Sequence, residues 1–204
     1  RKERKSGFLS PSLALNFFDT KTSQSTSFPY YINISSDKEL LFTPLINYGG
    51  GVDSSQRFNF DYNQLISGGY FSSFLTLDST FENSNSNKWL KEGSVINKYQ
   101  KNINENFNII AESALQTSKN YIQQTNPNDD LSYSSSLKSS ATINGYNLYK
   151  IDDILTLNIS SFQSNQNNEN NKTIPTVLPF VTYNTGKTNT NNYELNNSYE
   201  FYNI

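Results

Sequence analysis

Hydrophobic and polar residues alternate along much of this chain. In the stretch 57–63, Phe58, Phe60 and Tyr62 fall on one face of an extended strand, and the residues between them are polar. A period of two is typical of β-strands with two chemically different faces, and helices have a longer period. The same alternation recurs in three further stretches, 71–81, 155–160 and 193–201.

Clusters of Gly, Asn, Asp and Ser separate the alternating stretches. These residues readily adopt the backbone angles that tight turns demand. The clusters are residues 49–55, 68–69, 82–87, 126–130, 152–153, 165–172 and 186–192. Because strands with short links pair most simply with their sequence neighbours, the pattern predicts an all-β fold, an antiparallel meander of about eleven strands.

The stretch 88–124 has two interpretations. Residues 109–115 could form an amphipathic helix, but they also alternate as a strand does. Since Asn102–Asn106 reads as a turn, we predict a long β-hairpin here.

Three prolines, Pro11, Pro29 and Pro44, lie in the first strand-like segments, between Arg4 and Pro44. Proline lacks an N–H group, so in sheets it is confined to edges, strand starts and bulges. One interpretation is simple edge protection; the other is a deliberate weakness in the pairing of the first strands. For Pro44 we expect only that it ends or bends its strand.

Composition narrows the function classes. The 204 residues are 34% hydrophobic with a mean hydropathy of -0.66, which favours disorder, but 14 Phe and 14 Tyr oppose disorder. With 16 basic and 18 acidic residues, there is no positive excess to bind nucleic acid. The chain has no Cys and no His, which removes thiol nucleophiles, imidazole bases and the usual zinc, haem and iron–sulfur ligands. We therefore expect a protein that is not an enzyme and has no catalytic residues, metal or cofactor.

The polar faces of the strands point to a membrane barrel. They consist mostly of Asn, Ser, Thr and Gln, and only 17% of all residues are charged. Soluble sheets expose charged outer faces, whereas such neutral polar faces suit a hydrated lumen. Outer-membrane strands have about 9 to 11 residues with aromatic residues at both interfaces, and Phe and Tyr gather near the ends of these segments.

The opening stretch resembles, in order and spacing, the start of the β-barrel of the outer-membrane lipopolysaccharide-assembly family LptD. The residues that carry this resemblance are Ser6, Gly7, Phe8, Pro11, Pro29, Tyr30, Tyr31, Thr43 and Pro44. Asn128–Tyr133 is similar to the family's DDxYLRRY-type segment, and Ser161–Gln163 followed by Ile174–Pro179 is similar to the FQ…IPxVLP pattern of its alphaproteobacterial members. The chain departs from the family at Ile32, where an aromatic is typical, and in having serines in place of the DDxYLRRY arginines.

The resemblance implies the following organisation and function. Residues 1–5 would be a linker from an upstream periplasmic domain, and 6–204 the N-terminal portion of a large barrel in the outer membrane of a Gram-negative cell. The barrel would move lipopolysaccharide into the outer leaflet without enzymatic chemistry, and Pro11 and Pro29 would weaken the first strands as one side of a lateral gate. Implied partners are lipopolysaccharide, outer-membrane lipid, the plug lipoprotein LptE and the periplasmic bridge protein LptA.

Other interpretations stay open at this point. The chain could be a soluble all-β adhesin or glycan-binding module, in which Tyr and Asn contact sugars, or an Asn-rich disordered linker. The basic run Arg1–Lys5 could contact anionic lipid instead of forming a solvated linker. The acidic pairs Asp129–Asp130 and Asp152–Asp153 favour turn hydrogen bonds, with a weak Ca²⁺ or Mg²⁺ contact as the alternative.

Overall fold

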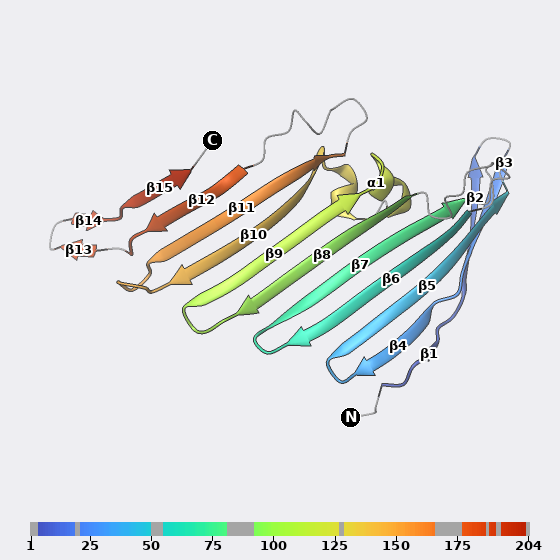
Figure 1. Cartoon of the computed structure of the whole chain (residues 1–204), viewed down its shortest axis with the longest axis horizontal. Helices are drawn as coiled ribbons and strands as arrows, with labels where there is room; N and C mark the ends of the chain where they lie inside the picture. Colours follow the sequence, from blue (N-terminus) through green and yellow to red (C-terminus); the bar gives the residue numbers. More distant parts are fainter. Residues whose placement is uncertain are drawn as a thin grey trace. The chain divides into compact units, whose positions relative to one another are not determined.

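A computed structural model of the chain describes residues 4–18, 21–49, 55–80, 92–126, 129–165, 177–186, 188–190 and 193–202 (Figure 1). The strands are β1 (Gly7–Phe8), β2 (Ser12–Phe18), β3 (Lys21–Ser27), β4 (Tyr30–Ser35), β5 (Lys38–Gly49), β6 (Ser55–Ile66), β7 (Gly69–Thr80), β8 (Glu92–Asn102), β9 (Phe107–Gln116), β10 (Ser136–Tyr146), β11 (Ile154–Ser164), β12 (Val177–Asn184), β13 (Thr188–Thr190), β14 (Tyr193–Leu195) and β15 (Ser198–Tyr202). A short helix α1 (Tyr121–Thr125) and a 3-10 turn η1 (Asp130–Tyr133) lie between β9 and β10.

The predicted all-β antiparallel meander is confirmed. The main sheet runs in the order β1-β4-β5-β6-β7-β8-β9-β10-β11-β12-β15, with β2 and β3 joined to it through the pairing of β3 with β5 (Figure 1). Strands β13 and β14 form a separate hairpin. The chain divides into two compact units, one of residues 1–65, 72–96 and 116–132 and the other of residues 66–71, 97–115 and 133–204.

In the first unit, one face of the sheet is apolar. Directly paired residues share a face, so Phe8, Tyr30, Phe42 and Phe60 form one row across β1, β4, β5 and β6. The ring centroids of Phe42 and Phe60 lie 4.9 Å apart. The opposite face carries Asn33, Glu39, Asn59 and Asp61 among others, as the alternation predicts.

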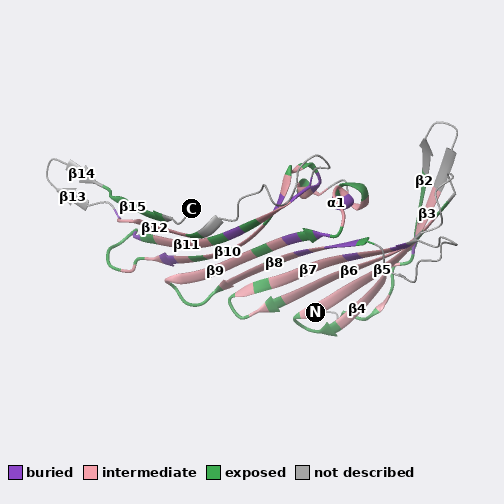
Figure 2. Ribbon diagram, turned by 45° about the horizontal axis from the view of Figure 1, so that its top comes forward, coloured by how far each residue is buried: buried purple, intermediate pink, exposed green. Residues whose placement is uncertain are grey.

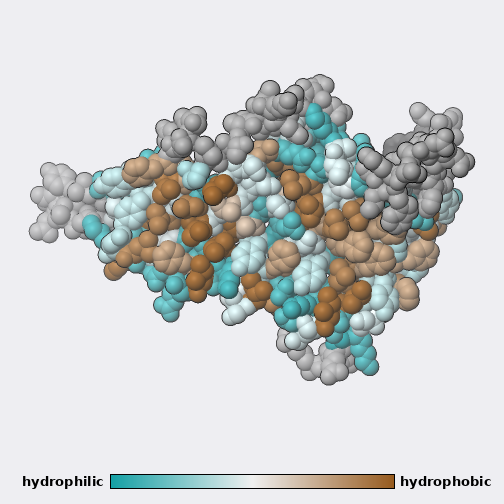
Figure 3. Space-filling model, in the orientation of Figure 1, coloured by the Kyte–Doolittle hydropathy of each residue, from teal (hydrophilic) through white to brown (hydrophobic). Residues whose placement is uncertain are grey.

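The second unit repeats this division. Its apolar face has the row Ile109, Ile143, Leu157, Val181 and Phe201, which crosses β9, β10, β11, β12 and β15. Figure 3 shows this face, where hydrophobic residues gather over β10, β11 and β12. The opposite face carries polar rows, for example Asn108, Asn144, Thr156, Thr182 and Glu200.

Few side chains are buried in the described part of the chain. The buried hydrophobic residues are Ile96, Ala114, Tyr121, Ile122 and Leu137, and polar residues are more numerous among the buried ones. Figure 2 shows intermediate burial along most of the strands. The aromatic and aliphatic side chains of the apolar faces are therefore mostly only partly buried in the described part of the chain. No helix among the described residues is long and apolar enough to span a membrane.

The connections between strands alternate in length. Ser36–Asp37, Ser67–Gly68 and Ile103–Asn106 connect β4 to β5, β6 to β7 and β8 to β9. At the other strand ends the connections 81–91, 117–135 and 165–176 are longer, while 50–54 at that end and 147–153 at the first end are of intermediate length. Because consecutive strands are antiparallel, short and long connections fall at opposite strand ends.

Two predictions about secondary structure need correction. Residues 109–115 belong to strand β9, so the long hairpin β8–β9 is confirmed, but the predicted hairpin arm does not extend to Gln124, because α1 follows it. The stretch 193–201 is two strands and not one. It breaks at Asn196–Asn197, where Asn197 bonds to Thr185 through both its backbone groups.

Candidate functional site

Pro11 and Pro29 lie where the first two strand paths of the sheet are interrupted. The first path consists of β1 and β2, separated by Leu9–Pro11, and the second consists of β3 and β4, separated by Phe28–Pro29. The pairs Phe8↔Tyr30 and Ser12↔Ser27 flank this break. Each proline removes an N–H group at the break, so the ladder bond that this group would donate is missing there.

A few contacts hold the two paths together at the break. The Leu9 amide donates to the Pro29 carbonyl oxygen at 2.9 Å, and the Phe28 amide donates to the Pro44 carbonyl oxygen at 3.1 Å. The hydroxyls of Ser12 and Ser27 lie 2.6 Å apart. The rings of Phe8 and Tyr30 meet edge to face, with centroids 4.8 Å apart.

Pro44 lies inside β5, which continues from Lys38 to Gly49. The strand therefore does not end at Pro44. On one side β5 pairs with β4 before this residue and with β3 after it, so Pro44 lies opposite the break in the second path. On the other side Pro44 pairs with Phe58 of β6.

The remaining residues of the sequence motif gather around the same edge of the sheet. Gly7 pairs with Tyr31, and the Tyr31 hydroxyl donates to Glu39 at 2.9 Å. Arg4 reaches the same carboxylate at 2.6 Å, and the Ser6 hydroxyl accepts the Asn33 amide. Thr43 pairs with Asn59. The motif residues thus lie on or beside the neighbouring strands β1, β4 and β5, Phe8 and Tyr30 on the apolar face and Tyr31 and Thr43 on the opposite face.

The outermost strands carry exposed apolar side chains. Phe8 is 81% exposed, and Leu9, Leu13 and Leu15 are also exposed. A hydrophobic edge strand is a template for pairing with another strand. This edge is therefore suited to meet further β-structure.

The other prolines differ from Pro11 and Pro29. Pro179 lies within β12 at a register shift against β11, which is a usual position for proline in a sheet. Pro127, Asn128 and Ile174–Thr176 lie outside the described residues, as do Arg1–Glu3 of the basic run.

A buried charge cluster on the polar face of the first unit was not predicted. Both Nε and Nη2 of Arg57 in β6 donate to Oδ2 of Asp78 in β7, at 3.1 and 3.0 Å. The two side chains are 18% and 14% exposed. Tyr121 of α1 is 1% exposed beside this pair, and burial followed by the charge of Asp78 raises the pKa of its hydroxyl. Sequence alternation places Arg57 on the polar face, but nothing in the sequence pairs it with a residue on the next strand.

In the second unit the polar face carries a ladder of hydrogen-bonded side chains. The Asn144 amide donates to Asn108 at 2.9 Å, and the Thr156 hydroxyl donates to Asn144 at 3.0 Å. Two residues further along β10 and β11, on the same face, the Asn158 amide donates to the Thr142 hydroxyl at 2.6 Å. These bonds run across β9, β10 and β11 between uncharged side chains.

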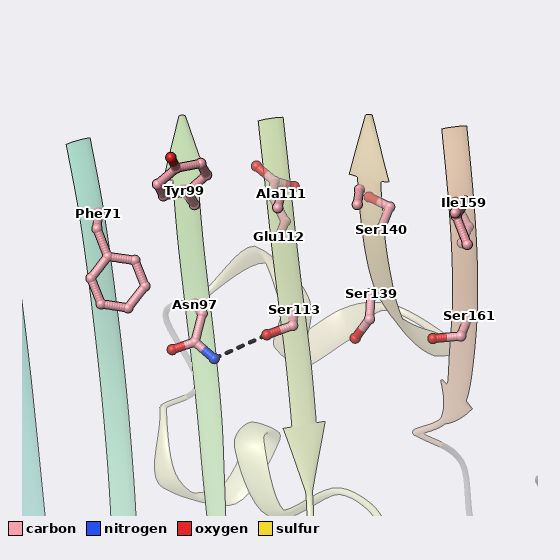
Figure 4. A pocket seen from close by; sticks show the side chains of 12 residues that line it. Phe71, Asn97, Tyr99, Ala111, Glu112, Ser113, Ser139, Ser140, Ile159 and Ser161 are labelled. Atoms are coloured by element: carbon pink, nitrogen blue, oxygen red, sulfur yellow. Dashed lines mark hydrogen bonds between the residues drawn. The ribbon is translucent and has the colours of Figure 1, made fainter. Parts of the chain in front are cut away.

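The apolar face of the second unit contains a shallow hollow of about 570 Å³. Small side chains leave it open: Ala111, Ser113, Ser139, Ala141 and Ser161 line it, with Phe71, Tyr99 and Ile159 around them (Figure 4). The Asn97 amide donates to the Ser113 hydroxyl at 3.0 Å inside it. Glu112 is the one carboxylate among its lining residues and is exposed.

The acidic pairs lie at turns, as predicted. Asp129 accepts the Leu131 amide, and the Asp153 carboxylate accepts the amides of Tyr149, Lys150 and Gly186 and the Tyr183 hydroxyl. These donors, the Gly186 amide above all, lower the pKa of Asp153 to about 2. No group of three or more metal-ligating His, Cys, Asp or Glu side chains occurs in the described ranges.

Comparisons with known proteins assign the chain to no family. No protein-family model matches the chain, and no curated protein matches it either.

Proposed function

We propose that this chain is part of an outer-membrane β-barrel that transfers lipopolysaccharide into the outer leaflet, and that its first strands form one side of a lateral opening. The observation that carries the proposal is the proline break at Pro11 and Pro29, at the edge of a sheet with one apolar and one polar face. The resemblance of residues 4–44 to the LptD family supports it. The transfer is non-enzymatic.

The two faces support a membrane position. A transmembrane strand must be apolar toward lipid and polar toward the lumen. The apolar rows that include Phe42 and Leu157 would face hydrocarbon, where they need no second protein layer. The ladder of Asn108, Asn144 and Thr156 would line a hydrated interior that accepts sugar hydroxyls.

The connections support the same assignment. Outer-membrane barrels have short periplasmic turns and longer extracellular loops. In this orientation Ser36–Asp37 and Ser67–Gly68 would face the periplasm, and the connection with α1 would face outward. The edge strand would meet the strand that closes the barrel, and the implied partners LptE and LptA would bind the complete barrel.

The energetics favour the break as the place of opening. A ladder hydrogen bond contributes about 0.5–1.5 kcal/mol net in water, but an unpaired backbone group in hydrocarbon costs several kcal/mol. A closed barrel therefore opens most easily where its backbone bonds are already missing. Lipid chains would pass sideways at Pro11 and Pro29 while the saccharide follows the polar face.

A disulfide across the break tests the proposal. Ser12 and Ser27 are directly paired, so cysteines at both positions have a geometry suited to a disulfide. In the full-length protein, we expect the oxidised S12C/S27C variant to stop the arrival of new lipopolysaccharide at the cell surface and a reductant to restore it. A disulfide from the first strand to the closing strand should act in the same way.

The matched control is S139C/S161C, another directly paired serine couple, in the second unit. It should form its disulfide without affecting export. Normal export with both the S12C/S27C bond and the bond from the first strand to the closing strand fully formed would refute the opening. A folded monomer in plain buffer, without detergent, would instead favour a soluble glycan-binding module.

A further inference from the structure

Three buried polar atoms in the first unit lack hydrogen-bond partners among the described residues. They are Oδ1 of Asn59, Oδ1 of Asp78 and the hydroxyl of Tyr121. Asn59 lies two residues from Arg57 on the same face of β6, and Tyr121 lies beside Arg57 and Asp78. A buried polar group without a partner loses its hydration and gains no hydrogen bond in return, so this arrangement opposes its own burial.

The segment Thr117–Asn126 contains α1, which places Tyr121 beside the Arg57–Asp78 pair. Tyr121 and Ile122 are each 1% exposed, and the Ile122 amide donates to the buried Gln116 side chain at 3.0 Å. These contacts hold the segment down, while the three unpartnered atoms favour its release. The packing of the segment is therefore opposed by the unpartnered atoms. A ligand that formed hydrogen bonds to those atoms would favour release of the segment from the sheet.

Charge selects the chemistry of such a ligand. A cation would meet the Arg57 guanidinium, and an anion would meet the free oxygen of Asp78. The two free oxygens need hydrogen donors, and Arg57 is itself a donor. A neutral group with adjacent hydroxyls, each able to donate and accept, fits this set.

We propose that Arg57, Asn59 and Asp78 form a binding site for sugar hydroxyls, and that the segment Thr117–Asn126 covers this site until a saccharide displaces Tyr121. The Tyr121 hydroxyl occupies the place that a sugar hydroxyl takes. The inference rests on the proposed function, since it assigns the saccharide part of the cargo to a specific place on the polar face.

Hydrogen exchange in the purified full-length protein in detergent micelles tests this site. The probe is a glucosamine disaccharide without acyl chains. The amides of Ile122 and Gln124 report on the cover, since they bond to Gln116 and to Asn120. With saturating disaccharide we expect both amides to exchange about fivefold faster or more.

The variant Asn59→Ala should lose this response, because it removes one of the two acceptors. The control Asn63→Ala, on the same strand and face but bonded to Asp61, should keep it. Unchanged exchange in the unmodified protein on addition of the disaccharide would overturn the proposal. This is the result expected if water molecules already satisfy the three buried atoms. An undiminished response in Asn59→Ala would overturn the proposal as well.

This result is independent of the export assay. If the disaccharide has no effect while S12C/S27C blocks export, the sugar site fails and the transport function stands. If the disaccharide response is present while export stays normal with both disulfides formed, the site stands and the lateral opening fails.

Discussion

The Leu9 amide donates a hydrogen bond to the carbonyl oxygen of Pro29, 2.9 Å away, across the point where both proline-bearing strand paths are interrupted. The path of β3 and β4 thus supplies the acceptor, the Pro29 carbonyl oxygen, for a donor on the path of β1 and β2. Since Pro29 has no N–H group, it cannot return a bond, and the pairing at this level is one-sided. The break is consequently held by few backbone bonds, and restoring the missing donors should strengthen it.

We expect the double variant Pro11→Ala/Pro29→Ala to pair more tightly. Each alanine restores an N–H group, and each bond it forms would add about 0.5–1.5 kcal/mol. Exchange at the Leu9 amide should slow, and lipopolysaccharide export should fall. Hydrogen exchange and surface lipopolysaccharide measure the two effects.

The same substitution at Pro179 is the control, because this proline lies at a register shift in β12, away from the break. Pro179→Ala should leave export unchanged. Faster exchange at Leu9 in the double variant would contradict the idea that the missing donors weaken the break.

Alternation was enough to predict the faces of the long strands. Phe58, Phe60 and Leu157 lie on the apolar faces because a strand's side chains must alternate, whatever its neighbours are. The proline positions predicted weak pairing, because proline lacks a donor in any context. The structure adds that Pro11 and Pro29 occupy the same break, which depends on strand register and cannot be read from either residue alone.

Contacts between distant residues could not be predicted in this way. Arg57 and Asp78 meet only because β6 and β7 pair in one particular register. Helix α1 has five residues, too few to show a helical period, and its burial depends on Gln116 and on neighbouring strands. Local patterns thus fix faces and turns, whereas the buried cluster is a product of tertiary structure.

Removing the Arg57 side chain should be costly. Arg57→Ala leaves Asp78 buried without its partner, and breaking a buried ion pair in this way costs about 3–5 kcal/mol. Urea unfolding in detergent micelles should show a clear fall in the midpoint. Replacing both partners with leucine should cost less, since no charge then remains buried.

Arg4→Ala is the matched control for this experiment. Arg4 also contacts a carboxylate, that of Glu39, but its side chain is 72% exposed. Exposed ion pairs contribute little to stability. Equal urea unfolding midpoints for Arg57→Ala and Arg4→Ala would show that the buried ion pair contributes no more stability than the exposed one.

Tyr121→Phe should strengthen the cover. The substitution keeps the buried ring and removes a hydroxyl that has no hydrogen-bond partner among the described residues, which relieves a cost of about 1 kcal/mol or more. The Ile122 amide should then exchange about fivefold more slowly without any ligand. Tyr133→Phe, at a tyrosine that is 75% exposed, should not change it. Faster exchange in Tyr121→Phe would mean that the hydroxyl holds the segment in place.

Asp153 should make the turn at 147–153 sensitive to acid. Its carboxylate is buried and accepts bonds from the Gly186, Lys150 and Tyr149 amides and from the Tyr183 hydroxyl. The Gly186 amide makes the largest contribution to lowering the pKa of Asp153, from its ordinary 3.8 to about 2. A lowered pKa in the folded state means that the unfolded state binds the proton more readily. The stabilisation is therefore complete above about pH 4 and is lost as the pH falls toward about 2.

Asp153→Asn should remove this part of the pH dependence. The variant cannot ionise at this position, so its unfolding midpoint should be lower than that of the unmodified protein at neutral pH, and the difference should shrink between about pH 4 and about pH 2. Asp152→Asn is the neighbouring control, because the hydrogen bond at residue 152 comes from its backbone amide to Asn147. Urea unfolding across this pH range measures both variants. A difference between Asp153→Asn and the unmodified protein that stays constant with pH would show that hydrogen-bond geometry, and not the charge of Asp153, stabilises the turn.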